Sequence, residues 1–327
     1  GSVCLGKTHM SELAFSGLGL NPVTASPPCV NDAGAVSGGS SSGAATSVAF
    51  GLAAAGIGSD TGGSVRAPAA WNDLVGLKTT SGRVSLEGVV PLCLKLDTVG
   101  PLTRSVEDAA LLLSMMENGK PADLRGASLK GRRFAVLETL AFDGLRDAPA
   151  AGFDHAVRRF RDAGAEIVPV KVPELPDAFS AVEVLYCGEA YGLWRDVIEA
   201  NPELMYDEIL ERFRAGAKHS APDYVAGWAL VEAVRMAWDS ATAGVDAVIC
   251  PTSPILPPSA DRLLSDHEYY VTENLLALRN TRIGNLMGVC ALTLPTGTPS
   301  CGVSLMGPPD SEEALLRLGA AAERALA

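Results

Sequence analysis

Residues that bind metals or form disulfides are scarce or badly spaced in this sequence. It has only four histidines among 327 residues, and its seven cysteines include no close pair such as Cys-x-x-Cys. Zinc sites and redox sites usually depend on such pairs. We therefore expect no metal site, and we expect the cysteines to be reduced core residues of a cytoplasmic protein.

Basic residues are in deficit. The 26 lysines and arginines are outnumbered by 38 acidic residues, which gives a formal net charge of −12. Because phosphate groups are bound by a surplus of positive charge, nucleic acid and anionic membrane surfaces are excluded as main partners. No apolar run is long enough to span a membrane either. The composition therefore indicates a soluble protein that binds neither nucleic acid nor a membrane.

Apolar residues, by contrast, are plentiful. Hydrophobic residues make up 47% of the chain and charged residues only 20%, which predicts a large core and little disorder. The pattern at 133–138, 148–163 and 166–170 predicts a strand, a helix and a second strand, and this order is typical of a parallel sheet. A long helical region follows at 177–243, and a buried strand is expected at 246–251. We therefore predict an α/β fold.

Two clusters of glycine and serine stand out from this background. They are GGSSSG at 38–43 and DTGGS at 60–64, and the residues between them, at 44–55, are small or apolar and predict a short buried helix. A glycine–serine run in isolation is usually a flexible linker. Here the run opens directly into an apolar helix, so we interpret both clusters as parts of a packed structure.

A serine that follows two glycines suits acyl transfer. Its hydroxyl can attack a carbonyl carbon, and backbone amides that glycine leaves accessible can stabilise the oxyanion that develops. No histidine has a supporting context, which argues against a Ser-His-Asp enzyme.

The segment around these clusters resembles the signature of the amidase signature family. The block at 38–70 begins GGSSSGAATSVAFG and ends SDTGGSVRAPAA, and the resemblance continues through LVGLKTTSGRVSLEGVVPL (74–92) and LDTVGPLTRSVEDAALLL (96–113). Upstream, residues 5–22 resemble the family's run before the signature. The resemblance implies a central mixed, largely parallel twisted sheet covered by helices on both faces.

The same resemblance implies how the chain is divided. We expect a single domain over residues 1–327, with the signature core at about 1–116 and a C-terminal sheet and helix portion at about 244–327. The helical region at about 177–243 is expected to vary within the family and to line the substrate entrance.

The resemblance also implies the site residues. Ser64 corresponds to the nucleophile, and Ser40 to a bridging serine that the family holds on a cis peptide bond, here after Gly39. The oxyanion-hole amides would be those of Thr61, Gly62, Gly63 and Ser64. The supporting residues would be Gly39, Ser41, Asp60 and Arg66.

Two roles are open for Arg66. It could bind a substrate carboxylate, because arginine recognises carboxylates with two parallel hydrogen bonds. It could instead pair with Asp60 and brace the loop, and we favour this second role.

The family's base is a lysine, and here the sequence departs from the pattern. In the family this lysine precedes the Gly-Lys-Thr run, which in this chain already lies at 6–8. Lys7, Lys78 and Lys95 do not match its position. We therefore expect the lysine upstream of residue 1. We also expect residues 3–5 to form a buried strand, followed by a helix from Ser11.

These features together predict an amidase that hydrolyses a small-molecule carboxamide through a serine acyl-enzyme, with no cofactor. One alternative is the glutamine-hydrolysing component of an aspartyl/glutamyl-tRNA amidotransferase, its A subunit, which shares the signature. Another is a fragment or binding module without catalysis. The oligomeric state stays open, with a homodimer as one option.

Overall fold

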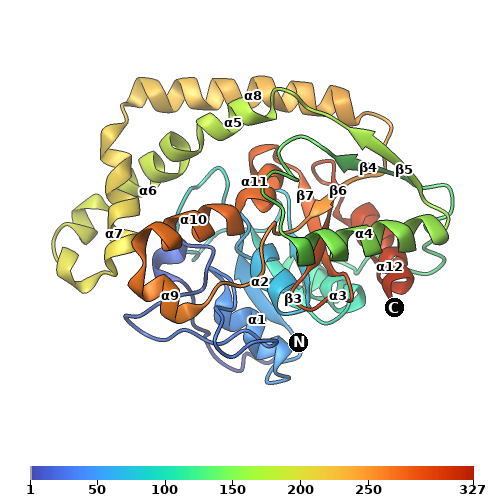
Figure 1. Cartoon of the computed structure of the whole chain (residues 1–327), viewed down its shortest axis with the longest axis horizontal. Coiled ribbons are helices and arrows are strands. Elements are labelled where there is room, and N and C mark those ends of the chain that lie inside the picture. The colour runs from blue at the N-terminus through green and yellow to red at the C-terminus, as the bar shows by residue number, and fades with distance from the viewer. Residues whose placement is uncertain (1) are drawn as a thin grey trace.

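A single eight-stranded sheet forms the centre of this computed structural model, which describes residues 2–327 (Figure 1). The strand order across the sheet is β1-β3-β2-β7-β8-β6-β4-β5. The strands are β1 (Gly56–Ser59), β2 (Val75–Lys78), β3 (Val99–Thr103), β4 (Arg133–Leu137), β5 (Glu166–Val170), β6 (Ala247–Pro251), β7 (Cys290–Pro295) and β8 (Gly302–Gly307).

The sheet is mixed, as expected, but the expectation that it is largely parallel was wrong. Only β4 with β5 and β4 with β6 run parallel, whereas the other five neighbouring pairs are antiparallel. The parallel pair β4–β5 is joined through the helix α4 (Asp147–Asp162), as the sequence predicted. Strands β7 and β8 are joined by a short turn, and short connections favour antiparallel pairing.

One face of the sheet is covered by three helices. They are α3 (Val106–Met116), α4 and α12 (Glu312–Leu326). Strand β7 shows why both faces are buried: Leu292 packs against these helices, whereas Ala291 packs in the core on the other side. Successive side chains of a strand point to opposite faces. A strand that is apolar throughout must therefore be covered twice.

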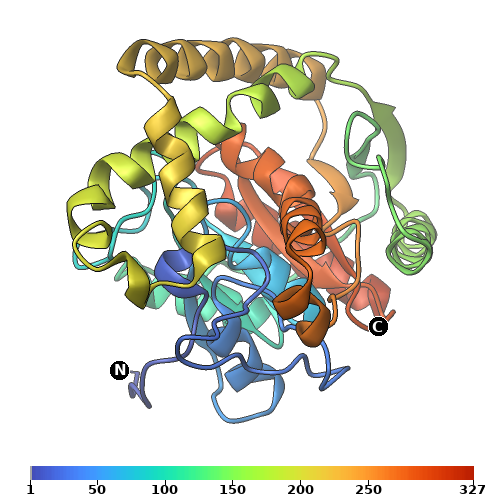
Figure 2. The same ribbon diagram turned by 60° about the vertical axis from the view of Figure 1, so that its left-hand side comes forward.

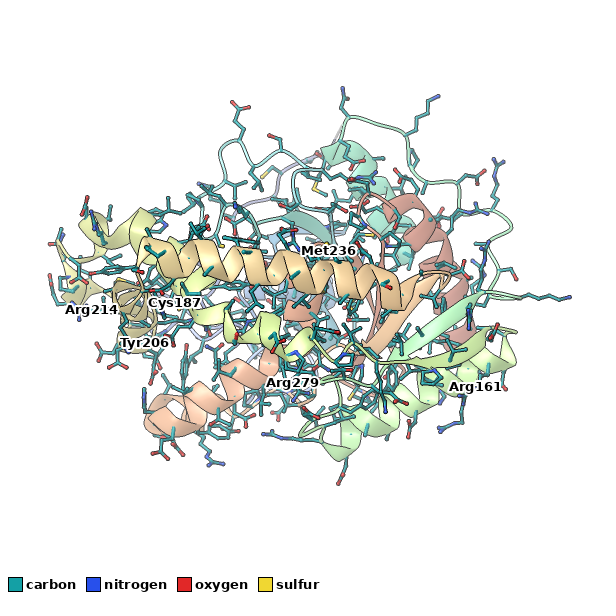
Figure 3. All side chains as sticks on the ribbon, turned by 90° about the horizontal axis from the view of Figure 1, so that it is seen from above. Arg161, Cys187, Tyr206, Arg214, Met236 and Arg279 are labelled. Carbon is teal, nitrogen blue, oxygen red and sulfur yellow. The ribbon has the colours of Figure 1, made fainter. Side chains whose placement is uncertain are left out.

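The other face carries the remaining helices, with the long helical region at its outer edge (Figures 1 and 2). Figure 3 shows α8 lying across the molecule, with Met236 on it, while Cys187, Tyr206 and Arg214 lie together at one end. The helices are α1 (Ser42–Ala49), α2 (Arg66–Trp71), α5 (Leu175–Ser180), α6 (Val182–Ile198), α7 (Asp207–Arg214), α8 (Ala221–Thr242), α9 (Ala260–Ser265), α10 (His267–Ala277) and α11 (Arg279–Leu286). Short 3-10 turns lie at Glu12–Ala14, Pro202–Leu204 and Ala215–Lys218.

The beginning of the chain differs from expectation. Residues 3–5 form no strand, and Val3 and Leu5 are 82% and 74% exposed. A strand is stable only when a neighbour pairs with it, and no described strand lies beside this segment. The helix expected from Ser11 is only the turn Glu12–Ala14, because Leu13 and Ala14 have positive φ angles that a helix cannot continue through.

The helix between the two glycine–serine clusters is also shorter than expected. It begins at Ser42 and ends at Ala49, instead of continuing to residue 55. Gly51 adopts a φ of +72°, and the amides of Gly51 and Leu52 donate to the carbonyls of Val48 and Ser47. This left-handed glycine ends the helix in the usual way. Over residues 2–327, no helix combines the length and hydropathy that crossing a membrane would require.

The cap of α3 provides a test of the fold at one residue. Ser105 accepts a hydrogen bond from the Asp108 amide at 3.1 Å, so replacing it by alanine leaves a helix N–H without its partner. We expect Ser105→Ala to lower the free energy of unfolding by about 1 kcal/mol. Urea unfolding followed by circular dichroism measures this loss. Ser259→Ala is the matched control, because Ser259 precedes α9 but makes no capping bond. An equal loss in both variants would contradict the prediction.

Candidate active site

The two glycine–serine clusters meet in the structure. The peptide bond between Gly39 and Ser40 is cis, which confirms the expectation. The amide of Ser41 donates to the carbonyl oxygen of Ser64 at 3.2 Å, so the clusters are in direct contact. Ser41 also donates its hydroxyl to the Ser59 carbonyl at 3.3 Å, which attaches the first cluster to β1.

Ser40 and Ser64 differ in their surroundings. Ser40 is completely buried, and its Oγ has no hydrogen-bond partner among the described residues. Burying a hydroxyl without a hydrogen bond costs roughly 1–3 kcal/mol of desolvation free energy, so an unsatisfied hydroxyl of this kind calls for an explanation. Ser64 is 4% exposed and lines a narrow pocket of about 10 Å³, which is roughly the room one water molecule needs.

The pocket around Ser64 is built by segments far apart in the sequence. Its walls come from the DTGGS turn, the segment before the first cluster, the loop at Leu92, the helical region, and the start of α11 with the residue before it. The lining residues are Ala14, Phe15, Ser16, Thr61, Gly62, Ser64, Leu92, Tyr186, Arg212, Leu278 and Arg282. The helical region therefore contributes to the pocket through Tyr186 on α6 and Arg212 on α7.

The DTGGS turn presents backbone amides beside Ser64. The amides of Thr61, Gly62 and Ser64 make no hydrogen bond to any residue that the structure describes. The fourth expected amide, that of Gly63, is already engaged, because it donates to Asp60 Oδ1 at 2.8 Å. Gly63 has a φ of +130°, and a Cβ there would lie 2.0 Å from Thr281 Oγ1. Only glycine fits this position.

Asp60 and Arg66 brace this turn, as we favoured from the sequence. Arg66 donates Nε and Nη2 to the two carboxylate oxygens of Asp60, both at 3.0 Å, and both side chains are fully buried. Burial alone would raise the pKa of Asp60, but the charge and hydrogen bonds of Arg66 outweigh it and lower the pKa to about 2. Arg66 is therefore committed to Asp60.

Several residues of this network were not found from the sequence. Asn285 accepts from Arg66 Nη2 at 2.6 Å and donates to Asp60 at 2.9 Å. Thr281 donates to the Gly62 carbonyl at 2.8 Å, and Tyr186 donates to the Thr61 carbonyl at 2.8 Å. Nothing local marks these residues, because they lie more than 100 positions from the turn. Only the packing of α6 and α11 against it shows their role.

The buried lysine of the chain lies elsewhere. Lys78 donates Nζ to the carbonyls of Thr79 and Val289, both at 2.9 Å, and it does not line the Ser64 pocket. Burial, together with the nearby charge of Arg66, lowers the pKa of Lys78 to about 8. The side chains that line the Ser64 pocket in the described residues include no lysine.

A metal ion has no ligand set in this pocket. Within residues 2–327, the group with suitable geometry is Glu208, Glu211 and His267, on the surface between α7 and α10. These are exposed or half-buried side chains outside the Ser64 pocket.

The geometry agrees with comparisons against known proteins. The family model described as Amidase matches residues 1–316. The chain belongs to the amidase family. It is 36% identical to the 2-amino-5-chloromuconic acid deaminase of Comamonas testosteroni, over 96% of this chain and 70% of that protein. It is also 33% identical to the A subunit of the glutamyl-tRNA(Gln) amidotransferase of Halobacterium salinarum, over 99% and 85% of the two chains.

A solved structure supports the same assignment for the fold. A crystal structure of an amidase aligns with a TM-score of 0.87 at 31% identity, covering 98% of this chain and 74% of that one. This amidase-family chain therefore has the amidase fold, and it is a hydrolase that acts on C–N bonds.

The first test of the site concerns its brace. Removing the carboxylate charge in Asp60→Asn leaves the Arg66 guanidinium buried and unpaired, which typically costs about 3–5 kcal/mol of unfolding free energy. We expect a loss of this size in urea unfolding. Asp123→Asn is the control, because Asp123 pairs with Arg125 on the surface, where such pairs contribute little. A loss below about 1 kcal/mol in Asp60→Asn would show that the ion pair does not brace the turn.

The second test concerns Lys78. Its folded-state pKa of about 8 lies below the ordinary value of 10.5, so the unfolded chain binds more protons between these two pH values. Stability attributable to Lys78 is therefore lowest below pH 8 and rises as the pH increases towards 10.5. Lys78→Met should lack this rise, so the difference in unfolding free energy between the native protein and the variant should change steadily from about pH 8 to about pH 10. Parallel curves from about pH 7 to about pH 10 would contradict the buried, depressed lysine.

Proposed function

We propose that the protein is an amidase that hydrolyses a small carboxamide through an acyl-enzyme formed on Ser64. One observation carries this proposal. The buried Ser40 hydroxyl and the backbone amides of the turn that holds Ser64 both lack hydrogen-bond partners, and the two segments that carry them are in contact. Groups that are buried and unsatisfied in the free protein are those that a reaction can use.

The proposed steps follow from these positions. Ser64 Oγ attacks the carboxamide carbon and passes its proton to Ser40, which relays it to a base. The amides of Thr61, Gly62 and Ser64 stabilise the oxyanion of the tetrahedral intermediate. Collapse of this intermediate releases ammonia or an amine, which takes up a proton, and leaves the acyl group on Ser64. Water then gives a proton to the base and attacks the ester, the acyl group leaves as a carboxylic acid, and Ser64 Oγ takes back a proton.

The base belongs to the same proposal. We assign it to the lysine that the family resemblance places upstream of residue 1, because Lys78 is engaged by two carbonyls and lies outside the Ser64 pocket. The pocket is narrow, so substrate entry requires side chains that line it to move apart.

The glutamine-hydrolysing component of a tRNA amidotransferase is the second candidate function. It is favoured by relatives of that name, among them the Halobacterium salinarum protein. Ammonia release from glutamine, compared with release from simple carboxamides, separates the two functions. We favour the stand-alone amidase acting in the cytoplasm. A purified homodimer that hydrolyses amides without other chains would support this choice.

Labelling with a fluorophosphonate tests the nucleophile in the full-length protein. We expect one adduct in the intact mass, and peptide mapping should place it on Ser64. Ser64→Ala should lose both the adduct and activity, by about 10³-fold or more. Ser40→Ala should react about 10²–10⁴-fold more slowly, because the proton relay is broken.

Ser47→Ala is the control, because Ser47 Oγ bonds only to the Ala44 carbonyl within α1. It should label like the native protein. Absence of any serine adduct in the full-length protein would overturn the amidase proposal and favour a binding module.

A further inference from the structure

Three cations are buried almost completely in the described residues, and one of them lacks a partner. Arg66 is paired with Asp60, and Lys78 is bound by two backbone carbonyls. Arg282 on α11 is 3% exposed, yet its Nε and Nη2 make no hydrogen bond, and no described carboxylate forms an ion pair with it. Arg66 and Lys78 therefore each have a partner, although Arg66 Nη1 makes no hydrogen bond, whereas no partner is found for Arg282 among the described residues.

Arg282 lies at the turn that carries Ser64. Its Nε is 3.7 Å from the position that a Cβ on Gly62 would occupy, and it lines the same pocket as Ser64. Its guanidinium is 6.0 Å from the ring of Tyr186, which is too far to replace a hydrogen-bond partner. Arg212 lines the same pocket and is stacked on Phe15 at 4.4 Å, so a second positive charge faces the site.

The surroundings of Arg282 make its isolation costly. Burial and the nearby charge of Arg212 lower the pKa of Arg282 to about 10, and no carboxylate group offsets this shift. A buried charge is normally paired or hydrogen-bonded, because removing it from water carries a large penalty. The chain carries 38 acidic residues, and none of them lines this pocket. A buried, unpaired arginine in an acidic protein is suited to bind an anion that is not part of the chain.

We propose that Arg282 binds a carboxylate of the substrate, so that the enzyme prefers an amide that also carries a free carboxylate, such as the monoamide of a short dicarboxylic acid. This inference rests on the proposed function, because it places the scissile amide at Ser64. The planar guanidinium can donate Nε and Nη2 to the two oxygens of one carboxylate, which are the two atoms that lack partners. Arg282 is thus a specificity-determining residue.

The kinetic test compares each monoamide with its uncharged diamide in the full-length protein. Malonamic, succinamic, glutaramic and adipamic acids, each with its diamide, cover the possible spacings. We expect the best monoamide to exceed its diamide in kcat/KM by about 10–100-fold. In Arg282→Gln this preference should disappear, because kcat/KM for the monoamide should fall at least about tenfold further than kcat/KM for the diamide, mainly through KM. Arg282→Lys should recover only part of it, because lysine lacks the planar fork.

The matched control is Arg195→Gln, which removes the same charge from an exposed position on α6. It should leave the preference unchanged. A native protein without preference for any monoamide would overturn the inference. A loss of monoamide and diamide turnover by the same factor in Arg282→Gln would overturn it as well, because it would indicate a structural role.

A binding measurement separates this inference from the proposed function. Calorimetry on Ser64→Ala requires no turnover, and we expect the preferred monoamide to bind it about tenfold more tightly, or better, than the Ser64→Ala, Arg282→Gln double variant. If native Ser64 fails to label but this difference is present, the amidase proposal fails and carboxylate binding stands. If Ser64 labels and the difference is absent, only the carboxylate inference fails.

Melting temperatures show whether the Arg282 variants are still folded. Because Arg282 is unpaired in the free protein, Arg282→Met should melt at the same temperature as the native protein or higher. Arg66→Met should melt lower, since it leaves Asp60 unpaired. The preferred monoamide should raise the melting temperature of Ser64→Ala but not that of the double variant. A lower melting temperature for Arg282→Met would show that the arginine stabilises the fold, against the inference.

Discussion

The buried ion pair between Asp60 and Arg66 is the interaction on which the candidate site depends. Asp60 receives the amide of Gly63, the guanidinium of Arg66 and the side-chain amide of Asn285, so one carboxylate joins the turn to α2 and α11. These bonds hold the turn in the shape that exposes its other amides. Without them, Ser64 would lie on a glycine-rich loop with no fixed conformation.

Buried polar groups with hydrogen-bond partners have a structural role here, whereas those without partners are the candidates for function. Asp60 and Lys78 are buried and hydrogen-bonded, and Arg66 is paired with Asp60 although its Nη1 has no partner; these three residues hold segments together. Ser40 Oγ and Arg282 are buried without partners. Ser40 belongs to the cluster that contacts the Ser64 turn, and Arg282 lines the same pocket as Ser64. A fold can carry such groups only where the remaining contacts already fix the backbone, because each costs free energy in the unbound protein.

Much of the fold could be predicted from the sequence because the signals are local. The unit β4-α4-β5 and the strand β6 follow from hydrophobic pattern. The strand expected at residues 3–5 and the direction of most strands were wrong. Both depend on which strand lies alongside, and hydrophobic pattern carries no information about a neighbour.

The sequence by itself determined the family and the two glycine–serine clusters, and it favoured the pairing of Asp60 with Arg66, since these residues lie within one continuous stretch. Only the tertiary structure decided which groups complete the site. Tyr186, Thr281, Arg282 and Asn285 are brought to the turn by α6 and α11, from distant parts of the chain. The lack of a partner on Arg282 is likewise a property of the packed molecule. A partner, or its absence, exists only once distant segments occupy the same space.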